Sequence, residues 1–421
     1  MKVLIIGSGA REHALARSLR HDPGVSELHA APGNPGIGHV AELHAVDPLD
    51  PAAVAALAVR LSVDLVVVGP EAPLVAGVAD PVRAAGIACF GPSGAAAMLE
   101  GSKAFAKEIM EAAGVATARS RVCSTASELA SALEEFGAPH VVKDDALAAG
   151  KGVVVTNDRK EALAHGDAVI SAGGRVVIEE YLDGPEVSVF CVSDGETVVP
   201  LEPAQDFKRA LDRDEGPNTG GMGAYSPLPW APRTLASDVV RTIALPTIRE
   251  MAKRGTPFQG VLYCGLALTS AGVRVIEFNA RFGDPEAQCV LARLETPLSA
   301  LLMASATGTL AALPPLQWHA DAAVTVVIAS SGYPAAPRSG DPIMGTESAE
   351  GDAGVHVLHA GTALGEDGRL VSAGGRVLSI VGVGHDLAAA RDRAYAGVAR
   401  ISLAGSHHRS DIALTAANME D

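Results

Sequence analysis

The chain has 421 residues, of which 48% are hydrophobic, and its formal net charge is -16. This length and hydrophobicity predict about two to four domains with large cores. The negative charge argues against nucleic acid or an anionic membrane as a partner, so a bound phosphate would need a local cluster of positive side chains. No apolar run reaches about 18 residues and the chain starts directly with a strand pattern, so we expect no membrane span and no signal peptide.

Five cysteines are scattered along the chain, and none forms a CxxC pair. They are Cys89, Cys123, Cys191, Cys264 and Cys289. This spacing favours a reducing compartment over a disulfide framework, so we expect a cytoplasmic protein with ordinary buried thiols.

The first hundred residues repeat a pattern of strand, glycine turn and helix. Residues 2–6 form an apolar run typical of a strand buried on both faces, and Gly7-Ser8-Gly9 leads into an expected helix over residues 10–20. The free N–H groups that start this helix could hold an anion. The turn begins a GxGxxG dinucleotide signature, but Glu12 occupies the third glycine position and weakens it. Further strands with turns are expected at residues 27–31, 64–68 and 87–90, which predicts a doubly wound α/β domain.

A loop of small residues with lysines follows in the middle of the chain. Lys103 begins an expected helix, with Lys107 one turn later on the same face. Two short strands, at residues 141–143 and 153–155, flank the loop 144–152, whose N–H groups and lysines could cover a polyphosphate. It is not a Walker loop, which opens a helix with GxxxxGK[ST]. A flexible hairpin with solvated lysines is the alternative.

Two later segments also suggest ligand contacts. A strand at residues 176–178 runs into the acidic segment 179–182, which could present backbone groups to adenine and a carboxylate to ribose, or could be a solvated turn. Residues 216–223 form a glycine-rich loop that is too long and polar for a simple connection. Such a loop can fold over a substrate.

Residues 273–288 hold the densest set of reactive side chains. Alternation along the expected strand places Glu277 and Asn279 on one face, where a carboxylate and an amide oxygen can share a hard cation such as Mg²⁺. Arg281 continues this face, so its guanidinium could reach oxygens gathered by the metal. We interpret the segment as a metal-phosphate site; the alternative is a strand edge with a surface salt bridge.

The C-terminal part, from about residue 323, contains expected strands at residues 324–328, 354–359 and 377–383 and a helix near residues 387–398. His407 and His408 look like a metal pair, but we expect a solvated tail there.

Motifs along the whole chain resemble those of the phosphoribosylamine–glycine ligases (glycinamide ribonucleotide synthetases), which are ATP-grasp enzymes of purine synthesis. The first part contains GSGAREHAL, PGNPG and GPEAPLVAG, and FGPSGAAAMLEGSKAFAK follows at the junction. The core contains KDDALAAGKGVVV, EEYLDGPEVSVF, AQDFKR, GPNTGGMGAYSP and EFNARFGDPEAQ, and the end contains SGYPAAP, HAGT, GGRVLSIV and RSDI. The string EFNARFGDPEAQ is highly specific to this family.

The resemblance implies an α/β and α+β multidomain fold. A Rossmann-like domain would span residues 1–101, an ATP-grasp core residues 102–322 with an ATP-lid subdomain at about 119–188, and a small mixed α/β domain residues 323–421. The implied reaction joins glycine to 5-phosphoribosylamine through a glycyl phosphate, with ATP and Mg²⁺ or Mn²⁺ as cofactors. These small molecules would be the partners of a monomer, or of a dimer.

The family roles map residue by residue onto this sequence. Glu277 and Asn279 would hold the metal, and Arg281 and Lys151 would serve catalysis. ATP would be bound by Lys103, Lys143, Gly150, Lys151, Gly152, Glu179, Glu180, Tyr181, Leu182 and Glu186. The other substrates would be bound by Gly9, Gly33, Asn34, Gly36, Glu71, Pro73, Leu74, Asp206, Lys208, Asn218, Thr219, Gly220, Gly221, Met222, Arg281 and Asp284.

The chain departs from the family pattern at four positions, of which one is Ala10 in the first loop, where a second glycine is common. Asp144 and Ala146 stand in a loop that usually reads KADGLAAGKG, which predicts an extra negative charge near ATP and, if the glycine had a positive φ, strain of about 1 kcal/mol. Phe207 stands where histidine is usual. A second metal would need a further ligand, for which the candidates are Asp206, Asp212 and Asp214.

Three other classes of protein compete with this interpretation. A nicotinamide dehydrogenase would explain the first turn but leave Lys151, Glu277 and Asn279 without a role. Other ATP-grasp ligases, such as biotin carboxylase-like or carboxyaminoimidazole enzymes, lack the GPNTGGMG and RFGDPE strings. A non-catalytic descendant would have lost the metal ligands, which this chain retains.

Overall fold

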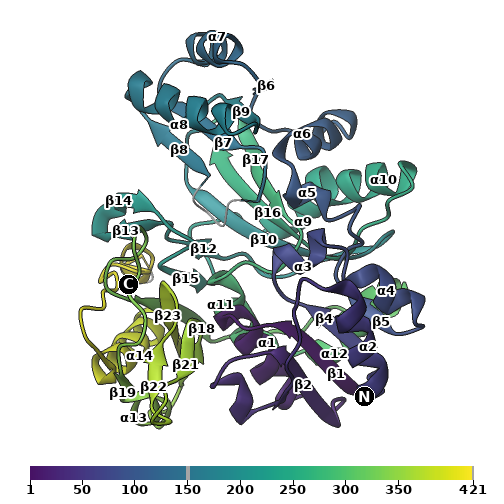
Figure 1. The fold of residues 1–421 in the computed structure, drawn as a ribbon, viewed down its shortest axis with the longest axis vertical. Coiled ribbons are helices and arrows are strands. Elements are labelled where there is room, and N and C mark those ends of the chain that lie inside the picture. The colour runs from purple at the N-terminus through teal and green to yellow at the C-terminus, as the bar shows by residue number, and fades with distance from the viewer. Residues whose placement is uncertain (148–151, 420–421) are drawn as a thin grey trace.

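The computed structural model describes residues 1–147 and 152–419. The N-terminal and C-terminal parts lie side by side at one end of the molecule, and a small sheet with two helices lies at the other end, with a central antiparallel sheet between them (Figure 1). Across the two described stretches, no helix is both long enough and apolar enough to cross a membrane.

The N-terminal part is a parallel sheet in the order β3-β2-β1-β4-β5. Its strands are β1 (Lys2–Gly7), β2 (Glu27–Pro32), β3 (Glu42–Leu43), β4 (Leu65–Val68) and β5 (Ala88–Phe90), and its helices are α1 (Ala10–Arg20), α2 (Pro51–Leu61), α3 (Glu71–Val75) and α4 (Ala79–Ala84). Val3 to Ile6 are fully buried, as expected for a central parallel strand. The predicted doubly wound architecture is confirmed.

A small antiparallel sheet in the order β6-β9-β7-β8 forms the far end of the molecule. It contains β6 (Ser120–Cys123), β7 (His140–Asp144), β8 (Val153–Thr156) and β9 (Val176–Glu179), with α7 (Ala126–Phe136) and α8 (Arg159–Ser171) packed on it. The face away from these helices carries Lys143 and points toward the central sheet. The predicted hairpin around loop 144–152 is therefore formed, although residues 148–151 lie outside the described residues.

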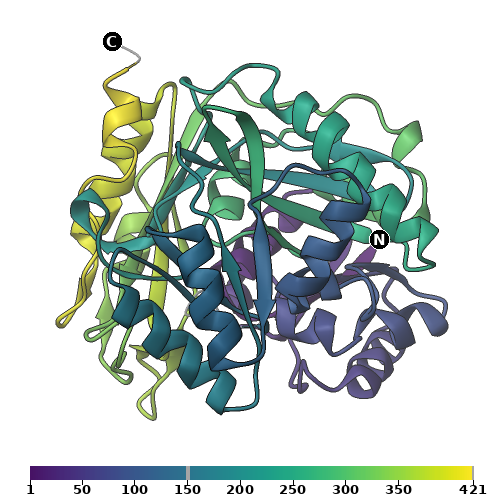
Figure 2. The same cartoon turned by 90° about the horizontal axis from the view of Figure 1, so that it is seen from above.

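The central sheet is antiparallel, in the order β11-β10-β16-β17. Its strands are β10 (Glu186–Asp194), β11 (Val198–Pro200), β16 (Gln259–Thr269) and β17 (Gly272–Asn279). The helices near it are α5 (Met98–Gly101), α6 (Lys103–Ala112), α9 (Leu235–Val239), α10 (Leu245–Lys253) and α12 (Leu298–Thr307). Helix α11 (Glu286–Arg293) packs instead against α1 and the sheet of the C-terminal part. Seen from above in Figure 2, the C-terminal part lies on one side of the molecule and the N-terminal part on the other.

The third large sheet has the order β12-β15-β18-β23-β20. It combines β12 (Gln205–Asp206) and β15 (Gly223–Ser226) with β18 (Ala322–Ala329), β20 (Val355–His359) and β23 (Arg376–Gly384), and α14 (Leu387–Arg400) covers it. The sheet therefore runs across residue 322, where the sequence predicted a domain boundary. Short pairs complete the part: β13 (Arg209–Leu211) with β14 (Glu215–Asn218), β19 (Ile343–Met344) with β24 (Ser402–Leu403), and β21 (Thr362–Leu364) with β22 (Leu370–Ser372).

The end of the chain is packed, contrary to the prediction of a solvated tail. His407 pairs through its backbone with Ala329, Arg409 is 1% exposed, and Ile412 is fully buried. Short helices α13 (Thr346–Glu350) and α15 (Leu414–Ala417) lie against α14. The five cysteines are free and buried, as predicted.

Candidate active site

The end of β17 holds the two oxygen donors that the sequence singled out. Glu277 pairs with Gly265 and Asn279 with Tyr263 in an uninterrupted stretch of the ladder, so both side chains lie on one face while Phe278 is buried on the other. Among the described residues, neither the Glu277 carboxylate nor the Asn279 amide has a hydrogen-bond or ion-pair partner. Their oxygens are therefore open to a ligand.

Positive charge surrounds Glu277 although no described cation touches it. Burial alone would raise the pKa of Glu277, but Lys208 and Lys143 attract the charged form and hold the pKa below its ordinary value. The carboxylate is thus ionised in a half-buried position, which is the form that coordinates a divalent cation.

Lys208 faces a group of carboxylates beside Glu277. Its Nζ lies 2.5 Å from Glu186 Oε2. Burial is the main cause that raises the pKa of Asp206, and nearby carboxylates add to the effect although Lys208 opposes it. These carboxylates belong to Glu186, Glu277 and Glu286. The oxygen donors of these side chains fit Mg²⁺ or Mn²⁺, which prefer oxygen ligands.

Two lysines hold the Glu179 carboxylate at the end of β9. Lys143 Nζ lies 2.9 Å from Glu179 Oε2 and donates to the carbonyl of Ile276, also at 2.9 Å. Lys107 Nζ lies 3.1 Å from Glu179 Oε1. The Lys143 ammonium has three donors, so one remains for a ligand phosphate. The Glu179 side chain is occupied by these lysines, and only its backbone is left to face adenine.

The segment after Glu179 leads into a shallow cavity of about 130 Å³ lined by Tyr181, Leu182 and Arg274. Glu180 also lines this cavity, and its carboxylate accepts hydrogen bonds from Arg119 and Arg274. Glu186 is bound to Lys208, as described above. Among the predicted ATP residues that the structure describes, Lys143 and Glu179 are therefore paired with each other, while Glu180 and Glu186 are engaged by other side chains.

Asp144 does not face this region, which corrects the prediction of an extra charge near ATP. Its Oδ1 lies 2.8 Å from Nε2 of His165 on α8, because alternation along β7 puts Asp144 opposite to Lys143. Ala146 is not among the described residues with a positive φ, so it carries no left-handed strain, and its carbonyl accepts from Lys103 Nζ at 3.3 Å. Gly152 accepts from the Asp144 N–H, while the predicted Gly150 and Lys151 lie outside the described residues.

The first glycine turn is closed by the protein itself. The Gly9 N–H donates to Glu12 Oε2 at 2.6 Å, and the Arg11 N–H donates to Asp284 Oδ2 at 3.4 Å. The prediction that this helix end holds an anion is therefore wrong for the Gly9 N–H, because Glu12 replaces the glycine that a dinucleotide signature needs.

Residues 33–36 form a second predicted substrate loop. The Asn34 side chain donates to the carbonyls of Ser8 and His359 and accepts from the Ile37 N–H, so it serves the loop itself. A Cβ on Gly36 would lie 2.4 Å from the His359 ring, which explains a glycine at this close approach. Gly33 has φ +70°.

Arg281 joins the third substrate loop to the central sheet. Its Nε lies 3.2 Å from Glu71 Oε2 and its Nη2 lies 3.0 Å from Glu100 Oε1. Glu100 also accepts from the Ala280 N–H at 2.7 Å. Pro73 and Leu74 are buried, so their side chains pack in the core and are not available to a substrate.

The glycine-rich loop is tied to the C-terminal sheet by Arg376. Its Nη1 donates to the carbonyls of Gly220 and Asp284, each at 2.7 Å, and lies 3.3 Å from Asp284 Oδ1. Thr219 donates twice to the Lys208 carbonyl. The Asn218 side chain donates to the carbonyl of Val153, and the Met222 side chain is fully buried. Gly221 has a φ of +112°, a backbone conformation that favours glycine.

Asp212 and Asp214 are not at the site, which removes two of the three candidates for a second metal ligand. Ser410 donates to Asp212, and Arg409 forms an ion pair with Asp214 at 2.7 Å. The same guanidinium lies 4.8 Å from the ring centre of Phe207, so the residue that replaces histidine serves as a cation–π partner.

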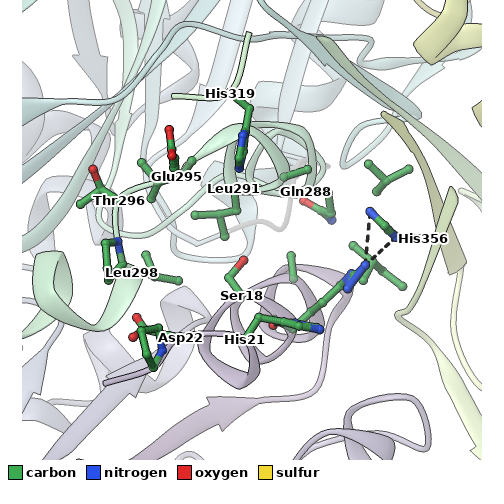
Figure 3. A pocket seen from close by; sticks show the side chains of 18 residues that line it. Ser18, His21, Asp22, Gln288, Leu291, Glu295, Thr296, Leu298, His319 and His356 are labelled. Atoms are coloured by element: carbon green, nitrogen blue, oxygen red, sulfur yellow. Dashed lines mark hydrogen bonds between the residues drawn. The ribbon is translucent and has the colours of Figure 1, made fainter. Parts of the chain in front are cut away.

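A larger cavity of about 330 Å³ lies elsewhere, between α1, the α11–α12 connection and β20 (Figure 3). His21, Glu295, His319 and His356 line it, and Arg17 binds His356 at its edge. None of the predicted catalytic, metal or substrate residues lines this cavity, so its size does not mark the active site.

Sequence reasoning missed several residues that shape the site. Glu100, Glu286 and Arg376 contact or surround the predicted residues. Each belongs to a motif that the sequence analysis quoted. Their own chemistry gave no separate signal because their partners lie far away in the chain.

Two antiparallel sheets that face each other across Lys143, Glu179 and Glu277, beside a Rossmann-like domain, define an ATP-grasp protein. The N domain, the ATP-grasp (A) domain and the C domain of phosphoribosylglycinamide synthetase match residues 1–100, 101–287 and 323–415. The chain belongs to the phosphoribosylglycinamide synthetase family.

Similar proteins agree with this assignment. A phosphoribosylamine–glycine ligase of Streptomyces coelicolor is 67% identical over 99% of this chain and 100% of its own length. One of Mycobacterium tuberculosis is 58% identical over 99% of both chains. The crystal structure of a phosphoribosylamine–glycine ligase from Thermotoga maritima has a TM-score of 0.84 at 31% identity and covers 98% of this chain and 100% of that one.

A biotin carboxylase from Campylobacter jejuni shares the fold alone, with a TM-score of 0.73 at 16% identity over 97% of this chain and 92% of that one. The predicted family, the three-part architecture and the prediction of an ATP-grasp carbon–nitrogen ligase are confirmed. The roles assigned to single residues stay predictions.

Proposed function

We propose that this chain joins glycine to 5-phosphoribosylamine, with ATP, to give glycinamide ribonucleotide, ADP and phosphate in purine biosynthesis. The observation that supports it most directly is the pair Glu277 and Asn279, whose oxygens have no described protein partner and lie among the charges of Lys143 and Lys208. We propose a cytoplasmic monomer whose partners are small molecules.

In the first step, a glycine carboxylate oxygen bonds to the γ-phosphorus of ATP as the bond from that phosphorus to ADP breaks. In the second step, the amine nitrogen of phosphoribosylamine bonds to the acyl carbon, phosphate leaves, and the nitrogen loses a proton. Phosphate is a much better leaving group than the original carboxylate oxygen. Phosphoryl transfer is accelerated mainly by positioning and charge neutralisation, which is what this site supplies.

Each group has a proposed task. Glu277 and Asn279 would hold Mg²⁺ or Mn²⁺, which supplies charge neutralisation at the ATP phosphates when it is bound. Lys143, already fixed by Glu179, directs its remaining donor to a phosphate. Lys103, whose ammonium reaches the Ala146 carbonyl, and the loop residues Gly150, Lys151 and Gly152 complete the proposed phosphate contacts. The backbone of residues 179–182 contacts adenine, and Glu186 contacts ribose.

Glycine and phosphoribosylamine are assigned to the region where the substrate loops meet Arg281 and Asp284. Glu71 and Arg281 are paired there, and Arg376 joins Gly220 to Asp284. Lys208 is fixed at both ends, because its ammonium pairs with Glu186 and its backbone carbonyl accepts hydrogen bonds from Thr219. We propose that Arg281 steadies the transferring phosphoryl group.

The test is ADP release by the purified full chain with ATP, Mg²⁺ and glycine, with and without phosphoribosylamine formed in place from ribose 5-phosphate and ammonia. The expected result is ADP only when all components are present, with glycine recovered in the product. Turnover that requires a different carboxylate or amine would refute the substrate assignment, and light scattering after size exclusion tests the monomer.

A further inference from the structure

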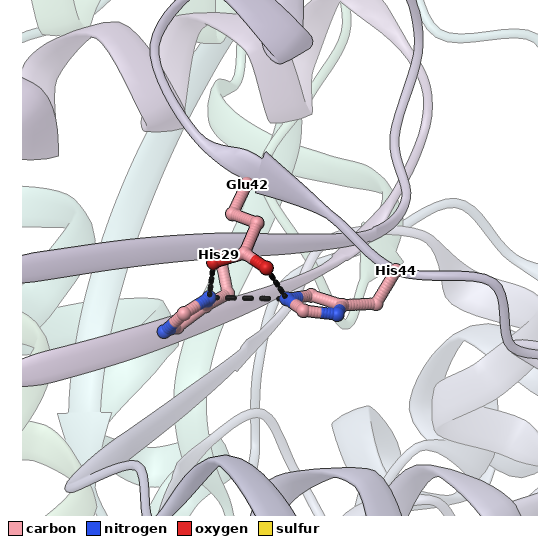
Figure 4. A group of neighbouring side chains, drawn as sticks. All are labelled: His29, Glu42 and His44. Carbon is pink, nitrogen blue, oxygen red and sulfur yellow. Dashed lines mark hydrogen bonds and ion pairs between the residues drawn. The ribbon is translucent and has the colours of Figure 1, made fainter.

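Three side chains with metal-binding atoms meet at the edge of the N-terminal sheet, on β2, on β3 and directly after β3, where no catalytic residue is predicted (Figure 4). We call His29, Glu42 and His44 the β3 cluster. His29 on β2 lies opposite Glu42 on β3 in the parallel register. The His44 N–H donates to the Ala30 carbonyl at 2.9 Å and so continues the ladder. The backbone therefore fixes where all three side chains start.

The distances between the three ligand atoms resemble the edges of a metal coordination shell. His29 Nδ1 lies 3.1 Å from His44 Nε2, and Glu42 lies 3.6 Å from the first atom through Oε2 and 3.8 Å from the second through Oε1. Tetrahedral zinc, with bonds of about 2.0–2.2 Å, separates neighbouring ligand atoms by about 3.3–3.5 Å. An ion fits between these atoms with shifts of a few tenths of an ångström.

A hydrogen bond between the two rings explains only part of this arrangement. It accounts for the 3.1 Å contact, but it leaves each Glu42 oxygen beyond hydrogen-bond distance of the ring nitrogen that it faces. A cation among the three atoms would satisfy both lone pairs and the carboxylate charge together.

The far side of His29 provides a second, independent observation. His29 is 6% exposed, and its buried Nε2 has no hydrogen-bond partner among the described residues. Glu27 Oε2 lies 3.7 Å from this Nε2 and 2.9 Å from the ammonium of Lys2. Histidines that bind metal usually present their other N–H to a carboxylate, which leaves the first nitrogen free for the ion. Glu27 is positioned for that task.

We propose that His29 Nδ1, His44 Nε2 and a Glu42 oxygen bind one divalent transition-metal ion of the zinc class, with water in the remaining position. Imidazole and carboxylate ligands suit Zn²⁺, and a given site of this kind holds it more tightly than Fe²⁺ or Mn²⁺. Glu42, with 69% of its side chain exposed, leaves the site open to entry from solvent.

The metal would fasten a very short edge strand. β3 has only two residues, and the second, Leu43, contacts the loop of residues 33–38 although its side chain stays partly open to solvent. A Cβ on Gly33 would lie 2.5 Å from Leu43 Cδ2, and one on Gly38 would lie 3.2 Å from Leu43 Cδ1. An ion that joins Glu42 and His44 to β2 would therefore hold the support of this loop in place, which is a structural role independent of the ligase reaction.

The test uses the full chain, stripped with a chelator and kept in excess Mg²⁺ so that the oxygen site at Glu277 is occupied. Co²⁺ is added as a spectroscopic probe and then displaced by Zn²⁺. The expected result is one equivalent of Co²⁺ with the visible absorption of a tetrahedral nitrogen and oxygen site, lost when Zn²⁺ is added. Zn²⁺ should also slow hydrogen exchange of the His44 amide.

Glu42→Gln and His44→Ala change exposed or partly exposed ligands and avoid the buried His29. Each should weaken Co²⁺ and Zn²⁺ binding by at least about tenfold, while His385→Ala, a change of a histidine outside the cluster, should leave it unchanged. Circular dichroism checks that the variants are folded. Absence of a tetrahedral Co²⁺ spectrum in the unsubstituted chain, or unchanged affinity in both ligand variants, would overturn the proposal whether or not the ligase is active.

Discussion

The Nδ1 atom of His13 accepts a hydrogen bond of 2.8 Å from the backbone N–H of His359, and this bond joins α1 of the N-terminal part to β20 of the C-terminal part. One turn of α1 later, Arg17 Nη2 lies 2.7 Å from Nδ1 of His356 on the same strand. The contact between the N-terminal part and the C-terminal part therefore depends on neutral imidazoles that accept hydrogen bonds.

Acid should weaken this contact. Burial is the main cause that lowers the pKa of His13 to about 3 and the pKa values of His356 and His359 to about 4, from an ordinary value of 6.5. The unfolded chain therefore takes up protons first as the pH falls, so the contribution to stability is complete above 6.5 and is lost as the pH falls toward 4. Between pH 8 and 5 the loss should be about 2 kcal/mol for each histidine.

Urea unfolding at both pH values measures this loss. His356→Asn, which keeps a side-chain acceptor for Arg17 without an imidazole, should show a smaller difference between pH 8 and 5 than the unsubstituted chain. Equal pH dependence of the two proteins would contradict the role of His356.

Glu277→Ala should abolish ligase activity without loss of stability. The carboxylate has no described protein partner, so its removal breaks no ion pair among the described residues, whereas the proposed metal loses a ligand. We expect glycine-dependent ADP release to fall by at least about a hundredfold, with an unchanged thermal midpoint. Glu366→Ala, at an exposed position of the C-terminal part, is the matched control. Full activity of Glu277→Ala would refute the metal assignment.

Glu179→Ala should destabilise the small sheet. It leaves the ammonium groups of Lys143 and Lys107 without their carboxylate, and the side chains of Lys143 and Glu179 are each 4% exposed. Removing one partner of such a buried pair costs about 3–5 kcal/mol.

The neighbouring Glu180→Ala breaks pairs with Arg119 and Arg274 that are more exposed, and it should cost at most about 1 kcal/mol. Chemical unfolding compares the two variants. A similar loss for both would show that burial of the Glu179 pair has no special effect.

Arg409→Lys should loosen the end of the chain although it keeps the charge. The guanidinium donates to both carboxylate oxygens of Asp411 at 2.8 Å and to Asp214 at 2.7 Å, while it stacks on Phe207. An ammonium cannot reproduce this fork, so we expect a loss of about 1–3 kcal/mol.

The control is Arg400→Lys, which changes a half-exposed pair with Asp352 and should have almost no effect. Limited proteolysis after residue 400 and thermal unfolding serve as readouts. Equal behaviour of the two variants would show that the Arg409 contacts do not hold the C-terminal segment.

The sequence by itself determined the elements and the chemistry that depends on neighbours in the chain. Alternation predicted that Glu277 and Asn279 share a face, and the strand and helix patterns of the N-terminal part matched the structure because such periodicities are local. Motif strings along the whole chain were sufficient to predict the family.

Only the tertiary structure decided which side chains remain open to a ligand. Glu12 closes the Gly9 turn, His165 draws Asp144 to the helix face of β7, and Arg409 draws Asp214 away from the site. The sheet that joins β12 and β15 to β18 likewise crosses a predicted boundary. These outcomes depend on residues far apart in the chain, and a local pattern cannot state which distant charge or hydrogen-bond donor packing brings within reach.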